Sequence, residues 1–429
     1  MNKIVLFIAV MMIAANIHSA DALPRARSVI EIWMWGGPSQ LDTFDPKPNA
    51  GKDYNNGLKA IPTNVPGISI CETLPLLAKQ ADKYSIIRSM THGINGHETA
   101  TYMMQTGREP GSGIVFPSIG AMIARAKIEN GLYKGKLPAY ISLTKNKGRF
   151  SECGFLSPRY KPMATGGNPN SGIFQVEGIV ARGMTPERIA RRKKLLASLD
   201  TLGKALPNNQ ELKDFDSSGD DAYELISGDA AKAFKLDLEP KGVRDRYGRN
   251  TFGQACLAAR RLVESGVPYI TINAQGWDTH KKHFDAMKRQ LAEMDQGISA
   301  LLQDLSERGL LDTTIVWWSG EFGRTPKIDW SEPWNGGRGH YARCFTSVVA
   351  GGGFKGGYVV GESDERAENV VSRPVYPANL LGSICELAGL DPDSPLANPM
   401  GLDLKVMPES DKGKGRLKEI YKNAQEIKK

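Results

Sequence analysis

Apolar runs rich in β-branched and aromatic residues recur along the chain, and each of them stops at a glycine or a polar turn. They cover residues 28–35, 84–88, 137–143, 269–273, 313–318 and 344–350. Short apolar runs bounded by turn residues are typical of strands that are buried on both faces of a sheet. The pattern therefore predicts a strand at each of these segments.

Segments with helical spacing of apolar residues lie between the predicted strands. Thr185 and Pro186 combine an N-cap residue with proline at the first helical position, which favours a helix start. The predicted helices cover residues 74–83, 98–105, 117–129, 185–202, 209–215, 221–234, 253–265, 283–308 and 377–390. Strands that alternate with helices favour the α/β class, with a mainly parallel sheet and helices on both of its faces.

One stretch interrupts this alternation. From 145 to 183 glycine, proline, asparagine and serine dominate and no period persists, and a mostly helical block follows from 185 to 265. Long irregular segments inside a domain are either functional excursions or disordered. We expect a single domain over residues 23–429 that carries a loop-rich and helical insertion at about 145–265.

The N-terminus has the pattern of an export signal. Lys3 precedes an apolar run at 4–17 that is short for a membrane span, and Ala20 and Ala22 bracket a small-residue cleavage site before Leu23. We expect residues 1–22 to be a cleavable signal peptide, the mature chain to be periplasmic or secreted, and no stable insertion in a membrane. An uncleaved anchor is the alternative interpretation.

Composition and charge narrow the class of partner. With 41% hydrophobic and 24% charged residues, the 429-residue chain can bury a core. Its net charge is +8, and basic residues cluster at 188–194 and 412–429. Such clusters attract anionic polymers such as polysaccharide, or membrane headgroups, although a solvated helix face and a frayed tail would show the same pattern. Export argues against nucleic acid as a partner.

The five cysteines are widely scattered, at positions 71, 153, 256, 344 and 385. No pair has the close spacing of a cysteine-type zinc site. Export permits one or two disulfides, and the odd number leaves at least one free thiol.

Candidate chemistry gathers at the carboxyl ends of the predicted strands. In a parallel sheet these ends lie along one edge, so residues distant in sequence can meet there. The polar residues at these positions are Asp42, His97, Asp278, His280, Glu321 and His340. Carboxylates combined with imidazoles suit Zn²⁺, Mn²⁺ or iron, whereas an oxygen-only set would suit Mg²⁺ or Ca²⁺. Together these residues predict a metal site.

Each of these residues also has a structural interpretation. Asp42 can cap a turn, His97 can begin a helix, and Glu321 can form an ion pair with Arg324. A guanidinium such as that of Arg324 also forks onto phosphate or sulfate oxygens, so an anion-binding role stands beside the ion pair. His283 begins an amphipathic helix, where we expect it to face solvent or Asp285.

Several motifs resemble the domain-of-unknown-function 1501 family, exported bacterial proteins grouped with the alkaline phosphatase and sulfatase superfamily. The resemblance covers nearly the whole mature chain. It rests on MWGGPSQLDTFDPKP (34–48), HETATYMMQTG (97–107), RRLVESGVPYITI (260–272), WDTH (277–280), SGEFGRTP (319–326), GRGHY (337–341) and AGGGFKGG (350–357). It implies an alkaline-phosphatase-like sandwich around a central, mostly parallel sheet, and the hydrolysis of phosphate or sulfate esters with one or two metals.

The resemblance also implies roles for single residues. Asp42 matches the acidic ligand after the first strand, Glu321 matches the acidic position of a later turn, and His340 matches the late histidine ligand. Asp278 and His280 resemble the remaining pair of ligands.

The chain departs from the superfamily pattern at several points, among them Gly339 in place of the usual aspartate and Gln275 in place of the first of two glycines. Phe322 stands where the superfamily has a histidine ligand, and His97 stands where sulfatases have their nucleophile. Thr99 is near in sequence, but in a helix it would point about 200° away from His97.

Our leading hypothesis is an exported hydrolase of phosphate or sulfate esters that depends on a divalent metal. Zinc is the first candidate, with manganese or calcium as alternatives, and the expected ligands are Asp42, Asp278, His280, Glu321 and His340. His97 would be a further ligand or a general acid and base, a water activated by the metal or Thr99 would attack, and Arg324 would hold the anion.

The substrate of this hypothesis is a small-molecule or polysaccharide ester. The alternative is a catalytically degenerate binding or scaffolding protein on the same fold, and a weaker third hypothesis is an assembly role at the cell surface. No oligomeric state follows from the sequence.

Overall fold

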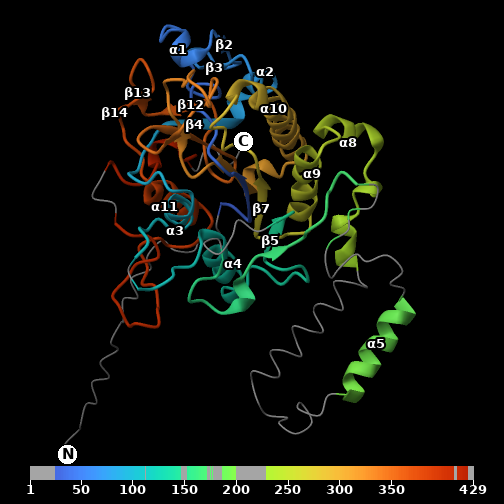
Figure 1. The fold of residues 1–429 in the computed structure, drawn as a ribbon. Helices are drawn as coiled ribbons and strands as arrows, with labels where there is room; N and C mark the ends of the chain where they lie inside the picture. The colour runs from blue at the N-terminus through green and yellow to red at the C-terminus, as the bar shows by residue number, and fades with distance from the viewer. Residues whose placement is uncertain are drawn as a thin grey trace, which may run out of the picture.

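The computed structural model describes residues 25–111, 113–145, 152–171, 174, 176, 186–199, 229–409 and 413–423. An eight-stranded sheet runs through the centre of the molecule (Figure 1). In spatial order its strands are β12 (Tyr358–Val360), β4 (Tyr84–Met90), β11 (Phe345–Ala350), β8 (Thr314–Ser319), β1 (Ser28–Met34), β7 (Tyr269–Ala274), β5 (Tyr140–Leu143) and β6 (Met163–Ala164). The signal peptide expected at 1–22 lies outside the described residues.

The sheet is mostly parallel, as predicted. Strand β11 is antiparallel to both of its neighbours, β4 and β8, while every other neighbouring pair of the sheet is parallel. Parallel neighbours need long crossover connections, which the helices between the strands provide.

Both faces of the sheet are buried, which explains why its strands lack polar alternation. In β1 the side chains of Ile30 and Ile32 enter one hydrophobic core, and those of Val29 and Trp33 enter the other. Successive side chains of a strand point to opposite faces, so a strand covered on both sides must be apolar at nearly every position.

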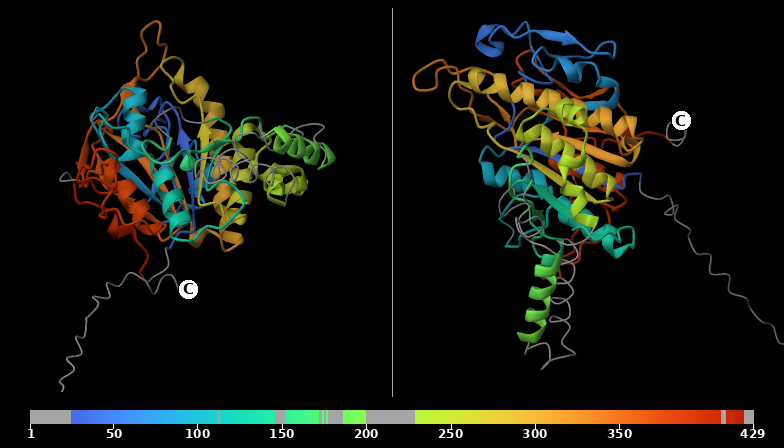
Figure 2. Two further views of the ribbon diagram at one scale, coloured as in Figure 1. Left: turned by 90° about the horizontal axis from the view of Figure 1, so that it is seen from below. Right: turned by 90° about the vertical axis from the view of Figure 1, so that its right-hand side faces the viewer.

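Helices cover the two faces in separate layers (Figure 2). The first layer contains α9 (Thr251–Glu264) and α10 (His283–Glu307), together with α2 (Pro75–Ala78) and α8 (Lys241–Tyr247). The second contains α3 (His97–Thr106), α4 (Ile119–Glu129) and α11 (Pro377–Leu387). The predicted α/β class, with helices on both faces of the sheet, is thereby confirmed.

Some predicted helices differ from those observed. The helix expected at 74–83 is divided into α2 and a 3₁₀ turn, Ala81–Lys83, and the final helix ends at Leu387. The helix expected at 209–215 lies outside the described residues, and the described end of 221–234 is a 3₁₀ helix, Asp229–Phe234. The insertion at about 145–265 stays a prediction, although α9, inside it, packs on β7 and α10.

Short elements connect the main ones. The remaining helices are α1 (Lys52–Asn55) and α5 (Pro186–Leu199), and the remaining strands are β2 (Ala60–Pro62), β3 (Ser69–Cys71), β9 (Gly323–Arg324), β10 (His340–Tyr341), β13 (Glu362–Ser363) and β14 (Val370–Ser372). Further 3₁₀ turns cover Pro158–Tyr160, Leu236–Leu238, Leu311–Thr313 and Lys418–Ile420. Among the described residues, no helix combines the length and the hydrophobicity that a bilayer span requires.

All five cysteines are described, and each is buried with a free thiol. They belong to the hydrophobic clusters or their margins, where burial raises the pKa of Cys71 to about 11 and that of Cys344 to about 12. A raised thiol pKa keeps the thiolate scarce at neutral pH, so these cysteines act as small apolar residues of the core.

Candidate metal centre

The carboxyl ends of β1, β7 and β8 lie side by side at one edge of the sheet. The register pairs Trp33 of β1 with Asn273 of β7 and with Ser319 of β8. The segments that follow β7 and β8 therefore begin at one place, and they carry Asp278 and Glu321. This is the edge at which the sequence predicted the site.

Gly36 joins the exit of β1 to both of these segments. Its N–H donates to Glu321 Oε1 at 2.9 Å, and its carbonyl accepts from Arg324 Nη1 at 2.9 Å. Its φ is +107°, and a Cβ at this position would lie 2.2 Å from the backbone nitrogen of Asp278. Glycine allows the three segments to approach each other this closely.

His97 points into the site from the N-terminal end of α3. Its Nδ1 lies 2.6 Å from Glu321 Oε1, and its Nε2 lies 3.2 Å from Asp278 Oδ2. The ring stacks on Trp35 with centroids 5.8 Å apart. Hydrogen bonds to Asp278 and Glu321 raise the pKa of His97 to about 9, because two carboxylates favour the protonated ring.

Asp278 is the centre of the arrangement. Its Oδ1 accepts from Arg324 Nη1 at 2.7 Å and lies 3.1 Å from His340 Nε2 and 3.0 Å from His280 Nε2. Burial alone would raise the pKa of Asp278, but hydrogen bonds from His340, His97 and Arg324 outweigh it and hold the pKa well below its usual range. Asp278 is therefore a carboxylate at any physiological pH.

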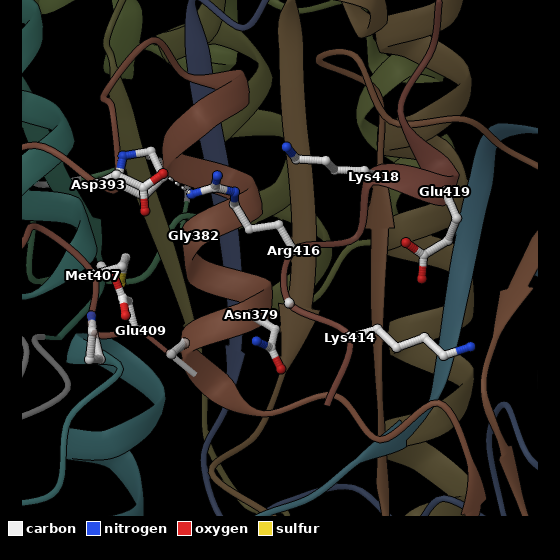
Figure 3. A pocket seen from close by; sticks show the side chains of 13 residues that line it. Asn379, Gly382, Asp393, Met407, Glu409, Lys414, Arg416, Lys418 and Glu419 are labelled. Atoms are coloured by element: carbon white, nitrogen blue, oxygen red, sulfur yellow. Dashed lines mark hydrogen bonds and ion pairs between the residues drawn. The ribbon is translucent and has the colours of Figure 1, made fainter. Parts of the chain in front are cut away.

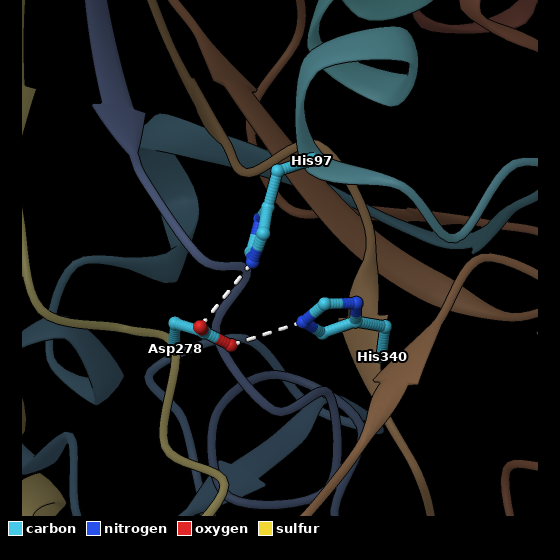
Figure 4. A group of neighbouring side chains, drawn as sticks. All are labelled: His97, Asp278 and His340. Carbon is cyan, nitrogen blue, oxygen red and sulfur yellow. Dashed lines mark hydrogen bonds and ion pairs between the residues drawn. The ribbon is translucent and has the colours of Figure 1, made fainter.

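Three imidazoles surround this carboxylate. Figure 4 shows His97 and His340 directed at Asp278 from two sides, and their ligand atoms all lie within 4.8 Å of one another. His280 adds a third ring, whose Nε2 lies 2.9 Å from His340 Nε2. Burial and the nearby Arg324 guanidinium lower the pKa of His280, which favours the neutral, metal-binding form of that ring.

This donor set fits a divalent ion of the zinc type. Tetrahedral zinc with ligands at its usual 2.0–2.2 Å separates neighbouring donor atoms by about 3.4 Å. The contacts of Asp278 with His97, His280 and His340 measure 3.2, 3.0 and 3.1 Å, close to this separation. His97 approaches Oδ2 of the carboxylate, whereas His280 and His340 approach Oδ1. Three nitrogens and one oxygen are a poor match for Ca²⁺, which takes six to eight oxygens.

Two further groups fix the orientation of the rings. Glu321 holds His97 through Nδ1, and the backbone oxygen of Asn95 lies 2.8 Å from Nδ1 of His340. Oxygen partners at Nδ1 leave Nε2 of each ring directed at the cluster, which is how hydrogen-bond partners commonly orient histidines that bind a metal. Glu321 is fully buried, and its Oε2 has no hydrogen-bond partner within the described structure.

Arg324 is fully buried and bound by protein oxygens. Besides Asp278, its guanidinium donates to the backbone carbonyls of Gly36 and Arg338. These contacts direct the positive charge at Asp278, where it offsets the cost of the buried part of that carboxylate. Arg324 therefore contacts the cluster, through Asp278, from the interior of the protein.

Asp42 belongs to a separate, fully buried ion-pair group. Its Oδ2 lies 2.6 Å from His283 Nε2, and its Oδ1 accepts from Arg338 Nη2 at 3.2 Å. Burial alone would raise the pKa of Asp42, but Arg338 and His283 outweigh it and lower the pKa to about 2. His283 Nδ1 lies 2.6 Å from Thr279 Oγ1, so the group holds the segment between Asp278 and His280 from below.

Thr99 and Phe322 lie at the margins of the site. The Thr99 hydroxyl is exposed and donates to the carbonyl of Gly96 at 3.2 Å, at the start of α3. Phe322 is buried, and its ring stacks on His340 with centroids 4.5 Å apart and lies 5.2 Å from His97. The Phe322 ring therefore packs against two imidazoles of the site.

Two histidines outside the predicted set of ligands are also buried near the site. We expected His283 to face solvent or Asp285, but it is fully buried and contacts Asp42. His92 is buried as well, with its Nε2 2.7 Å from the backbone oxygen of Glu321, and burial lowers its pKa to about 4. The scarcity of histidine in the chain was the one sequence signal that could have drawn attention to both.

The cluster is open to solvent. The exposed fractions of the side chains are 37% for Asp278, 36% for His280, 25% for His97 and 21% for His340. The four side chains are therefore partly exposed, whereas Glu321 and Arg324, which hold two of them, are fully buried.

Two cavities lie elsewhere on the molecule. One, of about 670 Å³, opens at the ends of β5 and β7 and is lined by Asn273, Gln275 and Arg289 among others. The other, of about 520 Å³, lies beside α11, where Arg416 forms an ion pair with Asp393 (Figure 3). Neither is lined by any of the candidate residues.

The solved structures to which the chain is similar share little sequence identity with it. The solved structure of the PsFucS1 sulfatase from Pseudoalteromonas sp. is 15% identical over 87% of this chain and 69% of that chain, with a TM-score of 0.38. A protein of the alkaline phosphatase superfamily from Vibrio parahaemolyticus is 7% identical over 86% and 68% of the two chains, with a TM-score of 0.39. No curated protein matches the sequence.

The family comparison is more extensive. The model described as "Protein of unknown function (DUF1501)" matches residues 26–413, a range that contains β1, the cluster and α11. Every residue of the candidate site falls within the match. The chain therefore belongs to the family of proteins of unknown function designated DUF1501.

Proposed function

We propose that the chain is a metal-dependent hydrolase of phosphate or sulfate esters. The observation that carries the proposal is the convergence of three imidazole Nε2 atoms on one carboxylate, within 3.0–3.2 Å of its oxygens, at the open carboxyl edge of the sheet. A bound divalent ion polarises an ester oxygen and lowers the pKa of water.

The proposed ligands are His97, Asp278, His280 and His340. The donor atoms of His97, Asp278 and His340 lie within 4.8 Å of one another, and Nε2 of His280 lies 3.0 Å from Asp278 Oδ1. Each of the four side chains is partly exposed. A catalytic metal site keeps one coordination position open to solvent or substrate, whereas in a structural site the protein fills every position. Nitrogen-rich ligation supports zinc first, then manganese, over calcium.

Three other predicted residues act as positioning residues in this proposal. Glu321 orients His97 through Nδ1, and Arg324 holds Asp278 in place. Asp42 anchors the helix start at His283, which follows the ligand His280 in the chain. These roles replace direct ligation by Asp42 and Glu321 and anion binding by Arg324.

Export supports an extracellular substrate. The charged start, apolar run and small-residue site of residues 1–22 have the pattern of a cleavable signal peptide, which leads to the periplasm or the medium. The substrate class in the proposal is accordingly a small-molecule or polysaccharide ester, and nucleic acid is not part of it.

Metal analysis and an activity panel together test the proposal. The purified protein should contain about one zinc per chain by mass spectrometry. After chelation and reconstitution with Zn²⁺, Mn²⁺ or Ca²⁺, it should hydrolyse at least one aryl phosphate, phosphodiester or aryl sulfate. Absence of metal uptake, with Asp278→Asn and wild type indistinguishable, would contradict the proposal.

A second candidate is a binding protein that holds the ion without turnover. The observation that favours it is that two groups expected to act on the substrate already form hydrogen bonds within the protein. The Thr99 hydroxyl donates to the carbonyl of Gly96, and the Arg324 guanidinium donates to protein oxygens. Full metal occupancy without hydrolysis of any ester in the panel, combined with retention of a polysaccharide on the metal-loaded protein, would select this candidate.

A further inference from the structure

Two tryptophans stand exposed beside the cluster. Trp330 is 49% exposed and Trp334 is 37% exposed, and both lie in the segment between β9 and β10. Within residues 277–341, all of which the structure describes, these two are the large hydrophobic side chains that are exposed. Exposed indoles have a large apolar surface to bury, which marks a place where a ligand can stack.

The segment that carries them is held firmly to the site. Lys282 N donates to the carbonyl of Trp334 at 3.0 Å, and His283 N donates to that of Gly336 at 3.1 Å. A Cβ on Gly337 would lie 1.7 Å from the carbonyl oxygen of His280, so the two segments are in direct backbone contact. The indoles are therefore presented by a braced loop rather than by a free one.

One of the two rings lies beside a residue of the cluster, and the other packs on the start of α10. The Trp334 ring lies 6.2 Å from the His280 ring, centroid to centroid. Trp330 stacks on Phe284 with an interplanar angle of 17°, which supports one face of its indole. A ligand held at His280 would meet Trp334 next.

Positive charge accompanies the aromatic surface. The Lys281 ammonium lies 5.8 Å from the centre of the Trp334 ring, and Lys282 and Lys327 are exposed on the neighbouring segments. Ammonium groups at the surface attract anionic groups of a ligand and raise its rate of encounter. Cations therefore lie beside the apolar faces, together with the exposed carboxylates of Asp285, Asp329 and Glu332.

We propose that Trp330 and Trp334 form a platform on which the sugar rings of an anionic oligosaccharide stack, so that its ester group reaches the histidine cluster. This inference rests on the proposed function and specifies its substrate class. Successive rings of a saccharide present flat apolar C–H faces that suit two indoles, and sulfate or phosphate groups suit the lysines.

A protein partner fits this surface less well. A stable protein interface buries about 800 Å² on each side, with a core of several apolar residues. Around Trp330 and Trp334 the exposed neighbours include Asp329, Glu332 and Lys281, all of them charged. An apolar surface made of two indoles and surrounded by charged side chains suits a short saccharide better than a protein.

Calorimetric binding tests the platform independently of turnover. The probes are size-defined oligosaccharides of dextran sulfate and of chondroitin sulfate, with their desulfated forms, titrated into the full-length wild-type protein. Trp330→Ala and Trp334→Ala should each weaken binding of the sulfated probe by about tenfold, the range of one lost stacking contact. Tyr358→Ala, which removes an equally exposed aromatic from the edge strand β12, should change binding less than about twofold.

The outcomes separate this inference from the proposed function. Turnover of aryl esters with unchanged saccharide binding in both tryptophan variants would overturn the platform and leave the hydrolase standing. Saccharide binding that depends on the indoles, without hydrolysis of any ester, would support the platform and contradict the hydrolase. The platform would also be overturned if neither sulfated probe bound to the wild-type protein. The same holds if a tryptophan variant changed the molar mass measured by light scattering but left saccharide binding unchanged.

Discussion

The Nε2 atoms of His280 and His340 lie 2.9 Å apart, although the two residues are 60 positions apart in the sequence. Both atoms also contact Asp278 Oδ1, so three donor atoms form a compact triangle. The tertiary structure brings these histidines together because β10 carries His340 to the segment that follows β7. Most of the predictions below depend on this arrangement.

Removal of the central carboxylate should abolish metal binding. Asp278→Asn replaces the carboxylate that all three imidazoles face with a neutral amide, and we expect the zinc affinity to fall by at least about 100-fold, the upper range even for loss of a group that only orients a ligand. Competition with a chromophoric chelator measures the affinity. Asp285→Asn, an exposed carboxylate on α10, is the matched control and should bind zinc as wild type does.

Loss of the partner that orients His97 should have an intermediate effect. Glu321→Gln keeps the size of the side chain but removes the carboxylate beside His97 Nδ1, so we expect zinc affinity to fall by about 10- to 100-fold. The same chelator competition measures it. An effect as large as that of Asp278→Asn would instead make Glu321 a direct ligand.

Acid should destabilise the protein through the Asp42 group. The pKa of Asp42 falls from 3.8 to about 2 on folding, so this carboxylate contributes about 2 kcal/mol that is present above pH 4 and lost as the pH falls toward 2. Burial lowers the pKa of His283, so the unfolded chain also takes up a proton below about pH 6.5, which has the same sign. Urea unfolding between pH 7 and pH 3 should show the decline.

The variant Asp42→Asn tests the origin of this acid sensitivity. It leaves the buried Arg338 without its carboxylate, at a cost of about 3–5 kcal/mol at pH 7. Its stability should fall less steeply than that of wild type as the pH is lowered. Parallel pH profiles for the variant and wild type would show that other groups control the acid response.

Gly36 should be intolerant of any side chain. Gly36→Ala combines the strain of φ +107° with a Cβ 2.2 Å from Asp278 N, so we expect more than about 3 kcal/mol of destabilisation and loss of zinc binding. Gly51→Ala is the control: its φ is +91°, and a Cβ there would meet nothing within 4 Å. It should cost only about 1–2 kcal/mol and leave zinc binding intact.

Hydrophobic pattern was sufficient to predict the main elements of the fold. The strand expected at 28–35 is Ser28–Met34, and the long helix expected at 283–308 is His283–Glu307. Both are long or strongly patterned, and both are covered by other elements as the pattern requires. The helix expected at 74–83 was predicted less accurately, because the structure divides it into α2 and a 3₁₀ turn. Asp295 on α10 accepts hydrogen bonds from the amides of Leu76 and Leu77 at the start of α2.

The clustering of polar side chains was predicted in part, and metal binding by them stays a prediction. Strand ends in a parallel sheet must share an edge, which is why Asp278, His280, Glu321 and His340 were selected and why they do lie together. Nothing in the local sequence distinguishes a residue that faces the edge from one that faces the interior. Asp42 and His283 have the same residue types as the cluster, but their contact is with each other.

The sequence by itself determined the α/β class, the order of strands and helices along the chain, and the edge of the sheet at which polar residues gather, because periodicity and turn residues act locally. The tertiary structure alone decided which of the acids and histidines meet. That choice depends on contacts across hundreds of positions, such as Glu321 with His97 and Asp42 with Arg338. Each buried charge must find a partner there, and the side chains left over with their donor atoms toward solvent form the candidate metal centre.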